Sequence, residues 1–272
     1  MKVKGQGSRV KSRGERPFAR TELQVKSYGI FGLTAYCSLF TASDAHAMHI
    51  SEGILPLNWA ALWFAVAIPF VWYGMKRLGE LSKVDLSYKP LVGLMAAIVF
   101  VISLMPIPVP TAGTCSHPGG TAIPAILLGP SITVLITGVA LLIQALFFAH
   151  GGLSTWGADV VSMGIMGAFT GVGVFKLMRK FNVSLAVSAF FAGMISDWAI
   201  YFTTSVELAA GIRGDGPFWP LFIKILIAFI PTQLPLGIVE GAMTAGMVKL
   251  LFKRRADLLV KFGVIKEEEA TL

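Results

Sequence analysis

The 272-residue sequence is 55% hydrophobic and only 14% charged, with a mean hydropathy of +0.72. These values exclude an ordinary soluble globular domain and indicate a protein that lies in a lipid bilayer. Its two cysteines, Cys37 and Cys115, support neither a disulfide scaffold nor a thiolate metal cluster. The net charge of +8 does not indicate nucleic-acid binding, because eight of the 23 Lys and Arg residues precede residue 30 and the others cluster at the ends of apolar runs.

Residues 1–47 have the pattern of a signal peptide. They begin with a polar, basic segment, continue with a mostly apolar run at 30–42, and end with small side chains at Ala45 and Ala47. The apolar run is shorter than the roughly 20 residues that a membrane-crossing helix needs. We therefore expect cleavage after Ala47, which leaves residues 48–272 as one membrane-embedded domain.

Seven apolar runs predict an all-α, polytopic membrane protein with about seven transmembrane helices. The third run is too short to cross a bilayer, and Pro124, Gly129 and Pro130 interrupt it, so we expect a half-helix packed against the fourth run. Irregular backbone at membrane depth must be buried or line a cavity, which makes this region a candidate for binding. The runs cover residues 58–78, 90–104, 121–128, 131–149, 158–177, 184–210 and 218–250.

The distribution of Lys and Arg predicts the orientation in a bacterial inner membrane. Basic residues gather in the loop after the first run, in the loop after the fifth run, and in the tail from about residue 249. These segments are expected in the cytoplasm. The mature amino terminus and the loops at 105–120 and 150–158 are nearly free of basic residues and are expected outside. An odd number of spans also places the carboxyl terminus opposite an external amino terminus.

Three of the four histidines, His49, His117 and His150, fall on or beside the segments predicted to be external. After cleavage, His49 would offer three nitrogen donors in one chelate: the Met48 amine, its own amide once deprotonated, and its imidazole. Such a planar array suits nickel or copper, and cobalt less strictly, and it should weaken in acid. His117 could complete the site from a Pro-Gly-Gly loop, although the same pattern fits a turn with an incidental histidine.

Four further residues are candidates for supporting roles or alternative ligands. Cys115 could reach the same site as His117 if the loop is extended, because alternate residues of a strand share a face. His150 could bind the metal or could simply cap the fourth helix. Glu52 and Asp159 could each orient a ligand histidine, or could be hydrated carboxylates near helix ends.

Four motifs, taken together, resemble the CbiM/NikM family, the substrate-capture subunits of energy-coupling-factor importers for cobalt and nickel. The resemblance implies that Met48, His49 and His117 hold the metal, so it depends on cleavage after Ala47. It favours the cobalt branch over the nickel branch, although Asp159 stands where the cobalt branch often has asparagine. The motifs, in chain order, are Met-His-Ile-Ser-Glu-Gly at 48–53, Cys-Ser-His-Pro at 115–118, Leu-Gly-Pro at 128–130 and His-Gly-Gly-Leu at 150–153.

The resemblance also implies partners and a physiological role. The family works with a transmembrane coupling subunit, ATPase subunits and a small accessory membrane subunit (CbiQ, CbiO and CbiN type), and its cobalt systems feed cobalamin biosynthesis. This sequence contains no Gly-xxxx-Gly-Lys-Ser/Thr motif, so we expect a transport subunit that is not itself an enzyme and has no cofactor.

Other functions are compatible with the composition. A passive channel or secondary cation transporter would use carboxylates within the apolar runs, such as Asp197 and Glu240, although structural pairing or contact with a partner subunit is the favoured interpretation of both residues. A capture subunit for an organic vitamin would need a larger, aromatic-lined pocket. A metal-dependent membrane hydrolase is disfavoured, because the sequence has no His-Glu-xx-His pair and no nucleophile motif.

Overall fold

The computed structural model describes residues 50–105, 107–109, 114–148 and 150–270. The predicted signal peptide, together with Met48 and His49, lies outside these residues.

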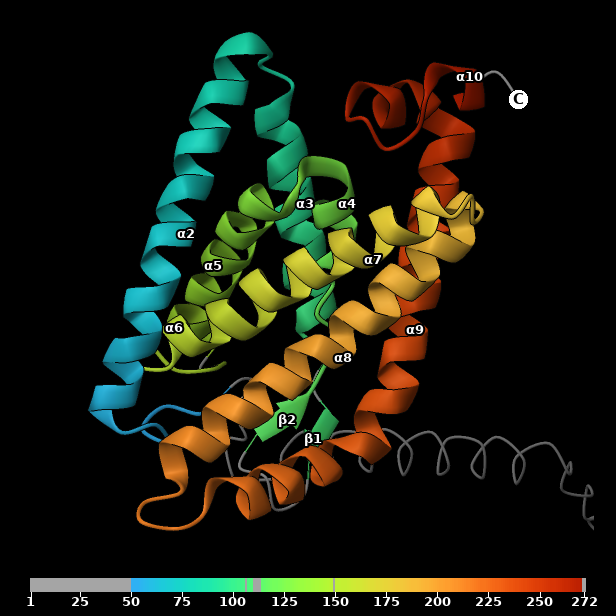
Figure 1. Ribbon diagram of the computed structural model, residues 1–272. Coiled ribbons are helices and arrows are strands. Elements are labelled where there is room, and N and C mark those ends of the chain that lie inside the picture. Colours follow the sequence, from blue (N-terminus) through green and yellow to red (C-terminus); the bar gives the residue numbers. More distant parts are fainter. Residues whose placement is uncertain (1–49, 106, 110–113, 149, 271–272) are drawn as a thin grey trace, which may run out of the picture. The chain divides into compact units, whose positions relative to one another are not determined.

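The described residues form helices over all seven predicted apolar runs (Figure 1). Five helices are long and apolar enough to cross a membrane, namely α2, α5, the continuous helix at 156–180, α8 and α9, and the 16-residue α3 is a shorter apolar helix. A small antiparallel hairpin, β1–β2, adds to the helices. The elements are α2 (Leu57–Val84), α3 (Tyr88–Ser103), β1 (Ile107–Val109), β2 (Thr114–Ser116), α4 (Ala122–Leu128), α5 (Pro130–Phe148), α6 (Trp156–Asp159), the π-helical η1 (Val160–Gly167), α7 (Ala168–Lys180), α8 (Leu185–Ile212), α9 (Phe218–Lys261) and α10 (Glu267–Ala270).

The predicted half-helix is confirmed. Helix α4 has only seven residues, of which Ala122 through Leu127 are buried, and it contacts α5 and α7. The chain turns at Gly129, whose φ of 86° is readily adopted by glycine, and Pro130 then starts α5. Helix α4 itself is therefore enclosed by protein, whereas the turn at Gly129 and Pro130 is only half-buried.

Helices α8 and α9 form the most extensive helix pair and carry buried acidic side chains. Figure 1 shows a bend in the first half of α9, the part that contains Pro231 and Pro235. Proline removes a helical hydrogen bond and is a common cause of such bends. Because of the bend, α9 packs along α8 and also contacts the β1–β2 hairpin.

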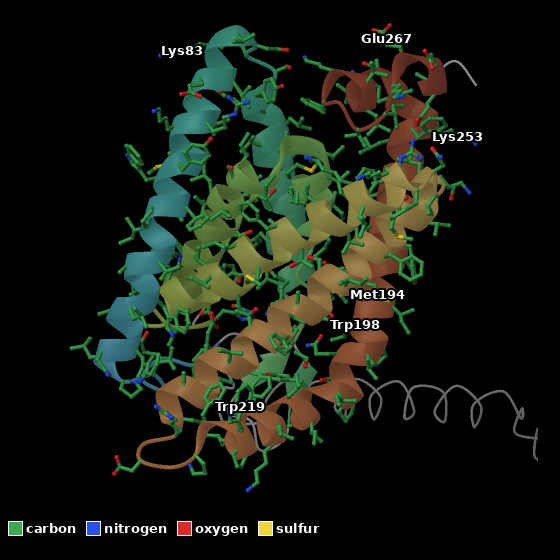
Figure 2. All side chains as sticks on the ribbon, viewed as in Figure 1. Lys83, Met194, Trp198, Trp219, Lys253 and Glu267 are labelled. Atoms are coloured by element: carbon green, nitrogen blue, oxygen red, sulfur yellow. The ribbon has the colours of Figure 1, made fainter. Side chains whose placement is uncertain are left out.

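Basic side chains gather at one end of the helices. Figure 2 shows Lys83 and Lys253 at the same end of the described chain and Trp219 at the opposite end. The helix ends at Lys83 in α2 and at Arg179 and Lys180 in α7 are basic as well. This arrangement matches the segments from which the sequence predicts the cytoplasmic face.

A glycine on α2 provides a test of the packing. A Cβ atom at Gly74 would lie 2.4 Å from the backbone oxygen of Ser131, whereas a Cβ atom at Gly79 would meet nothing within 4 Å. We expect Gly74→Ala to lower the free energy of unfolding by about 1–3 kcal/mol through overpacking. Gly79→Ala on the same helix should be neutral or stabilising by up to about 1 kcal/mol, because alanine favours helix.

Thermal unfolding of the purified protein in detergent, followed by tryptophan fluorescence, measures both effects. Equal melting temperatures for the two variants would contradict the close packing of α2 against α5.

Candidate metal centre

The first described residue is held by two buried side chains. The backbone N–H of Ile50 donates to Asp159 Oδ1 at 3.1 Å, and the Thr155 hydroxyl donates to the carbonyl of Ile50 at 2.6 Å. Asp159 and Thr155 are both buried and lie at the start of the helix at 156–180. Hydrogen bonds in such an environment define a position closely, because breaking them would leave polar groups unsatisfied in a low-dielectric interior. The backbone one residue after His49 is therefore fixed.

The His150-Gly151-Gly152 motif makes room for this segment. A Cβ atom at Gly152 would lie 2.7 Å from the Cα of Glu52, so only glycine fits where the two stretches cross. Gly151 has a φ of 82°, which glycine adopts without strain. The backbone N–H of Ser154 donates to Glu52 Oε2 at 3.0 Å, and hydrogen bonds from Ser154 lower the pKa of the Glu52 carboxyl. Glu52 thus ties the amino-terminal segment to the loop that carries His150.

His117 lies on a second loop, between β2 and α4. His117 is only 3% exposed, and its backbone is clamped by Tyr201 on α8: the His117 N–H donates to the Tyr201 hydroxyl at 2.7 Å, and that hydroxyl donates to the His117 carbonyl at 3.0 Å. The His117 Nδ1 lies 3.0 Å from the carbonyl oxygen of Pro118. A proton on Nδ1 satisfies this contact and leaves the lone pair of the ring on Nε2, where it can be donated to a metal.

Glu240 on α9 holds the two glycines that follow. Its carboxylate accepts the N–H of Gly119 at 2.6 Å and the N–H of Gly120 at 3.0 Å, and its side chain is 1% exposed. Asp197 on α8 is also buried and lies beside Glu240. The sequence favoured a structural role for these two acids. The arrangement is consistent with that role, because Glu240 binds the backbone of the His117 loop.

The hairpin before His117 anchors the other end of the loop. The hydroxyls of Ser116 and Thr232 on α9 are 2.6 Å apart. Cys115 lies in β2 with an extended backbone, paired with Pro108 of β1. The strand ends at Ser116, so His117 lies just outside it.

His150 lies close enough to His117 for the two rings to interact electrostatically. Burial, and the positive charge that His117 can carry, lower the pKa of His150 to about 3. His150 is therefore neutral at physiological pH. A neutral imidazole can donate a lone pair to a metal, and a protonated one cannot.

One buried acid was missed in the sequence. Glu207 on α8 is fully buried, beside Asp159 and Ser162, and it adds a second carboxyl to the polar cluster behind Ile50. The sequence could have indicated it, because Glu207 is an acidic residue within the apolar run at 184–210, as Asp197 is.

The arrangement joins two sequence segments directly and a third through an electrostatic interaction. Contacts connect Ile50 and Glu52 to the loop at 150–155, and His150 interacts in turn with His117. No group of three or more His, Cys, Asp or Glu side chains within the described residues could hold a metal. Imidazole and amine nitrogens suit nickel, copper and cobalt.

The fold and the site define a helical, multi-pass membrane protein. It has a buried polar site that contains histidines, at the end of the molecule opposite the basic helix ends. Residues 49–258 match the family model described as "CbiM: Cobalt uptake substrate-specific transmembrane region". The chain belongs to the CbiM family, in agreement with the resemblance found in its motifs.

Curated relatives and solved structures agree with this assignment. The chain is 68% identical to "Cobalt transport protein CbiM" of Geobacter sulfurreducens over 84% of its own length and 66% of that protein. It is 56% identical to the protein of the same name from Sorangium cellulosum, over 80% of its own length and 97% of that protein. A crystal structure of a truncated transition metal transporter is similar with a TM-score of 0.69 and 26% identity, covering 76% of this chain and 99% of that one.

The lowered pKa of His150 predicts a pH dependence of stability. In the unfolded chain His150 takes up a proton near its ordinary pKa of about 6.5, whereas in the folded protein it does so only near 3. The free energy of unfolding therefore decreases as the pH falls below about 6.5. Melting temperatures of the metal-free protein at pH 7 and pH 5 should differ less for His150→Gln than for the parent protein. The same pH dependence in both would contradict a buried, neutral His150.

Proposed function

We propose that this protein is the metal-capturing membrane subunit of a cobalt importer. The observation that carries the proposal is that Asp159 and Thr155 fix the backbone of Ile50. Ile50 is one residue after His49, and it lies on the same side of the molecule as the His150 loop. A rigid backbone at this point is what a site built from the first residues of a mature chain would need.

The metal site itself is assembled from two segments. Cleavage after Ala47 exposes the Met48 amine, and this amine, the deprotonated His49 amide and the His49 imidazole supply three nitrogen donors. His117 supplies the fourth from its clamped loop, and His150 stands beside it as an alternative or supporting ligand. The family match begins at His49, which is consistent with a removable segment before Met48. Protons compete for the amine and the amide, so capture weakens in acid.

Cobalt is the proposed cargo. The family description and the names of the relatives refer to cobalt, and the Cys-Ser-His-Pro and His-Gly-Gly motifs resemble the cobalt branch. Nickel is the alternative, because nitrogen donors bind both ions well. A passive route through the intramembrane acids is less favoured, because the Glu240 carboxylate is engaged by Gly119 and Gly120.

Import requires partners that supply energy. We propose a transmembrane coupling subunit, ATPase subunits and a small accessory membrane subunit, in an energy-coupling-factor complex that serves cobalamin biosynthesis. The basic helix ends and the tail face the cytoplasm, and the metal site faces outward. The His117 loop is attached to α8 through Tyr201 and to α9 through Glu240. A movement of α9 relative to the amino-terminal segment would therefore shift the His117 loop and release the metal.

Uptake of radioactive cobalt by cells that contain the partner subunits tests the function. We expect His117→Ala to reduce uptake to the level of cells without the protein, because one ligand is lost. Asp159→Ala should reduce uptake at low cobalt concentration by roughly tenfold, as loss of a group that positions a ligand commonly does. Asp215→Ala, which removes an exposed carboxylate from the loop between α8 and α9, is the matched control and should leave uptake unchanged.

Two results would contradict the proposal. Cobalt uptake that survives His117→Ala would remove the assigned site. Uptake that survives inactivation of the ATPase partners would favour a passive or secondary transporter.

A further inference from the structure

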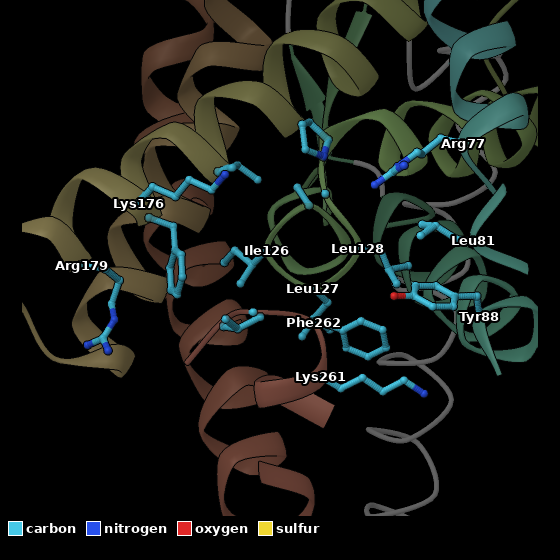
Figure 3. A pocket seen from close by; sticks show the side chains of 17 residues that line it. Arg77, Leu81, Tyr88, Ile126, Leu127, Leu128, Lys176, Arg179, Lys261 and Phe262 are labelled. Carbon is cyan, nitrogen blue, oxygen red and sulfur yellow. The ribbon is translucent and has the colours of Figure 1, made fainter. Parts of the chain in front are cut away.

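A pocket of about 430 Å³ lies among the basic helix ends, away from the proposed metal site. Its walls come from the ends of α2 and α7, the start of α3, the turn between α4 and α5, and the segment that follows α9 (Figure 3). Because α2 and α7 belong to helices that are long enough to cross a membrane, their ends lie near a membrane surface. The pocket is therefore at the level of lipid headgroups.

The charge of the lining is entirely positive. Four cationic side chains line the pocket, and no acidic side chain does. Two of these cations are neutralised by acids outside the lining, since Lys261 pairs with Asp85 and Arg179 pairs with Glu269.

The two other cations are available to a ligand. Figure 3 shows Arg77 and Lys176 extending toward the pocket from opposite walls, with the Tyr88 hydroxyl directed inward below Arg77. Among the residues that the structure describes, Arg77 forms one ion pair, an exposed contact of 3.5 Å with Glu80, which contributes little. Lys176 is exposed and has no ion pair within the described part of the chain.

The remaining lining is apolar. Leu81, Leu128 and Phe262 lie around and below the cationic groups in Figure 3. A ligand that fits this pocket combines a negative charge with an apolar portion. Inorganic phosphate has the charge but gains nothing from the apolar wall, and a docking protein would need roughly 800 Å² on each side, far more than one pocket offers.

We propose that this pocket binds the headgroup of an anionic phospholipid, with the phosphate between Arg77 and Lys176 and the Tyr88 hydroxyl as a further donor. Basic pockets between transmembrane helices on the cytoplasmic side are suited to such headgroups. The bound lipid would bridge α2, α3 and α7, which meet at the pocket next to the segment after α9.

Native mass spectrometry of the purified full-length protein in detergent tests the proposal. We expect the protein to retain phosphatidylglycerol in preference to phosphatidylcholine with the same acyl chains. Removing both available cations in Arg77→Gln/Lys176→Gln should weaken phosphatidylglycerol binding by roughly tenfold or more. Lys176→Gln alone, at an exposed side chain that leaves the packing intact, should weaken binding by a few-fold.

The matched control removes two charges from the same end of the molecule without touching the pocket. Lys83 and Lys253 are exposed and do not line it, so Lys83→Gln/Lys253→Gln should retain the lipid.

Equal losses in the two double variants, or equal binding of phosphatidylcholine, would overturn the proposal. Displacement of the lipid by inorganic phosphate at the same concentration would reassign the pocket to free phosphate. Loss of binding to an acidic partner subunit in the Arg77/Lys176 variant, without any lipid bound to the parent protein, would reassign it to a protein contact.

Discussion

The two hydrogen bonds that hold the backbone of Ile50 are the constraint on which the rest of the site depends. An N–H and a carbonyl of an entering chain would each cost free energy if buried without a partner, and Asp159 and Thr155 satisfy both. Asp159 and Thr155 start the helix at 156–180, and the glycines before them admit Glu52 at contact distance. The backbone at Ile50 is thus built into the fold.

The second half of the site depends on α8 and α9. Tyr201 and Glu240 hold the loop of His117 through four hydrogen bonds to its backbone, and Ser116 is joined to Thr232 before it. Backbone contacts of this kind fix the position of the loop. Buried acids in a membrane protein often indicate an ion path, but here the carboxylate of Glu240 shapes a loop. The same contacts couple the backbone of the His117 loop to the helix pair.

The sequence predicted those features that depend on local pattern. Hydropathy alone placed all seven helical runs, because a bilayer demands long apolar segments, and the prolines and Gly129 predicted the half-helix. The motifs predicted the family. The partners of Asp159, Glu52 and Glu240 could not be predicted, because each bonds to backbone about 100 residues or more away. Glu207 was overlooked although its charge within an apolar run was visible, and the predicted ligands Met48 and His49 lie outside the described residues.

The central claim, that a processed amino terminus held by Asp159 and Thr155 supplies metal donors, is tested most directly by the intact mass of the purified protein with and without added cobalt. The account predicts a chain that begins at Met48 and retains one cobalt ion, and that loses the ion when His49 is replaced by alanine. A chain that still begins at Met1 and binds cobalt equally well would contradict it, and would leave His117, His150 and Cys115 as the ligands to consider.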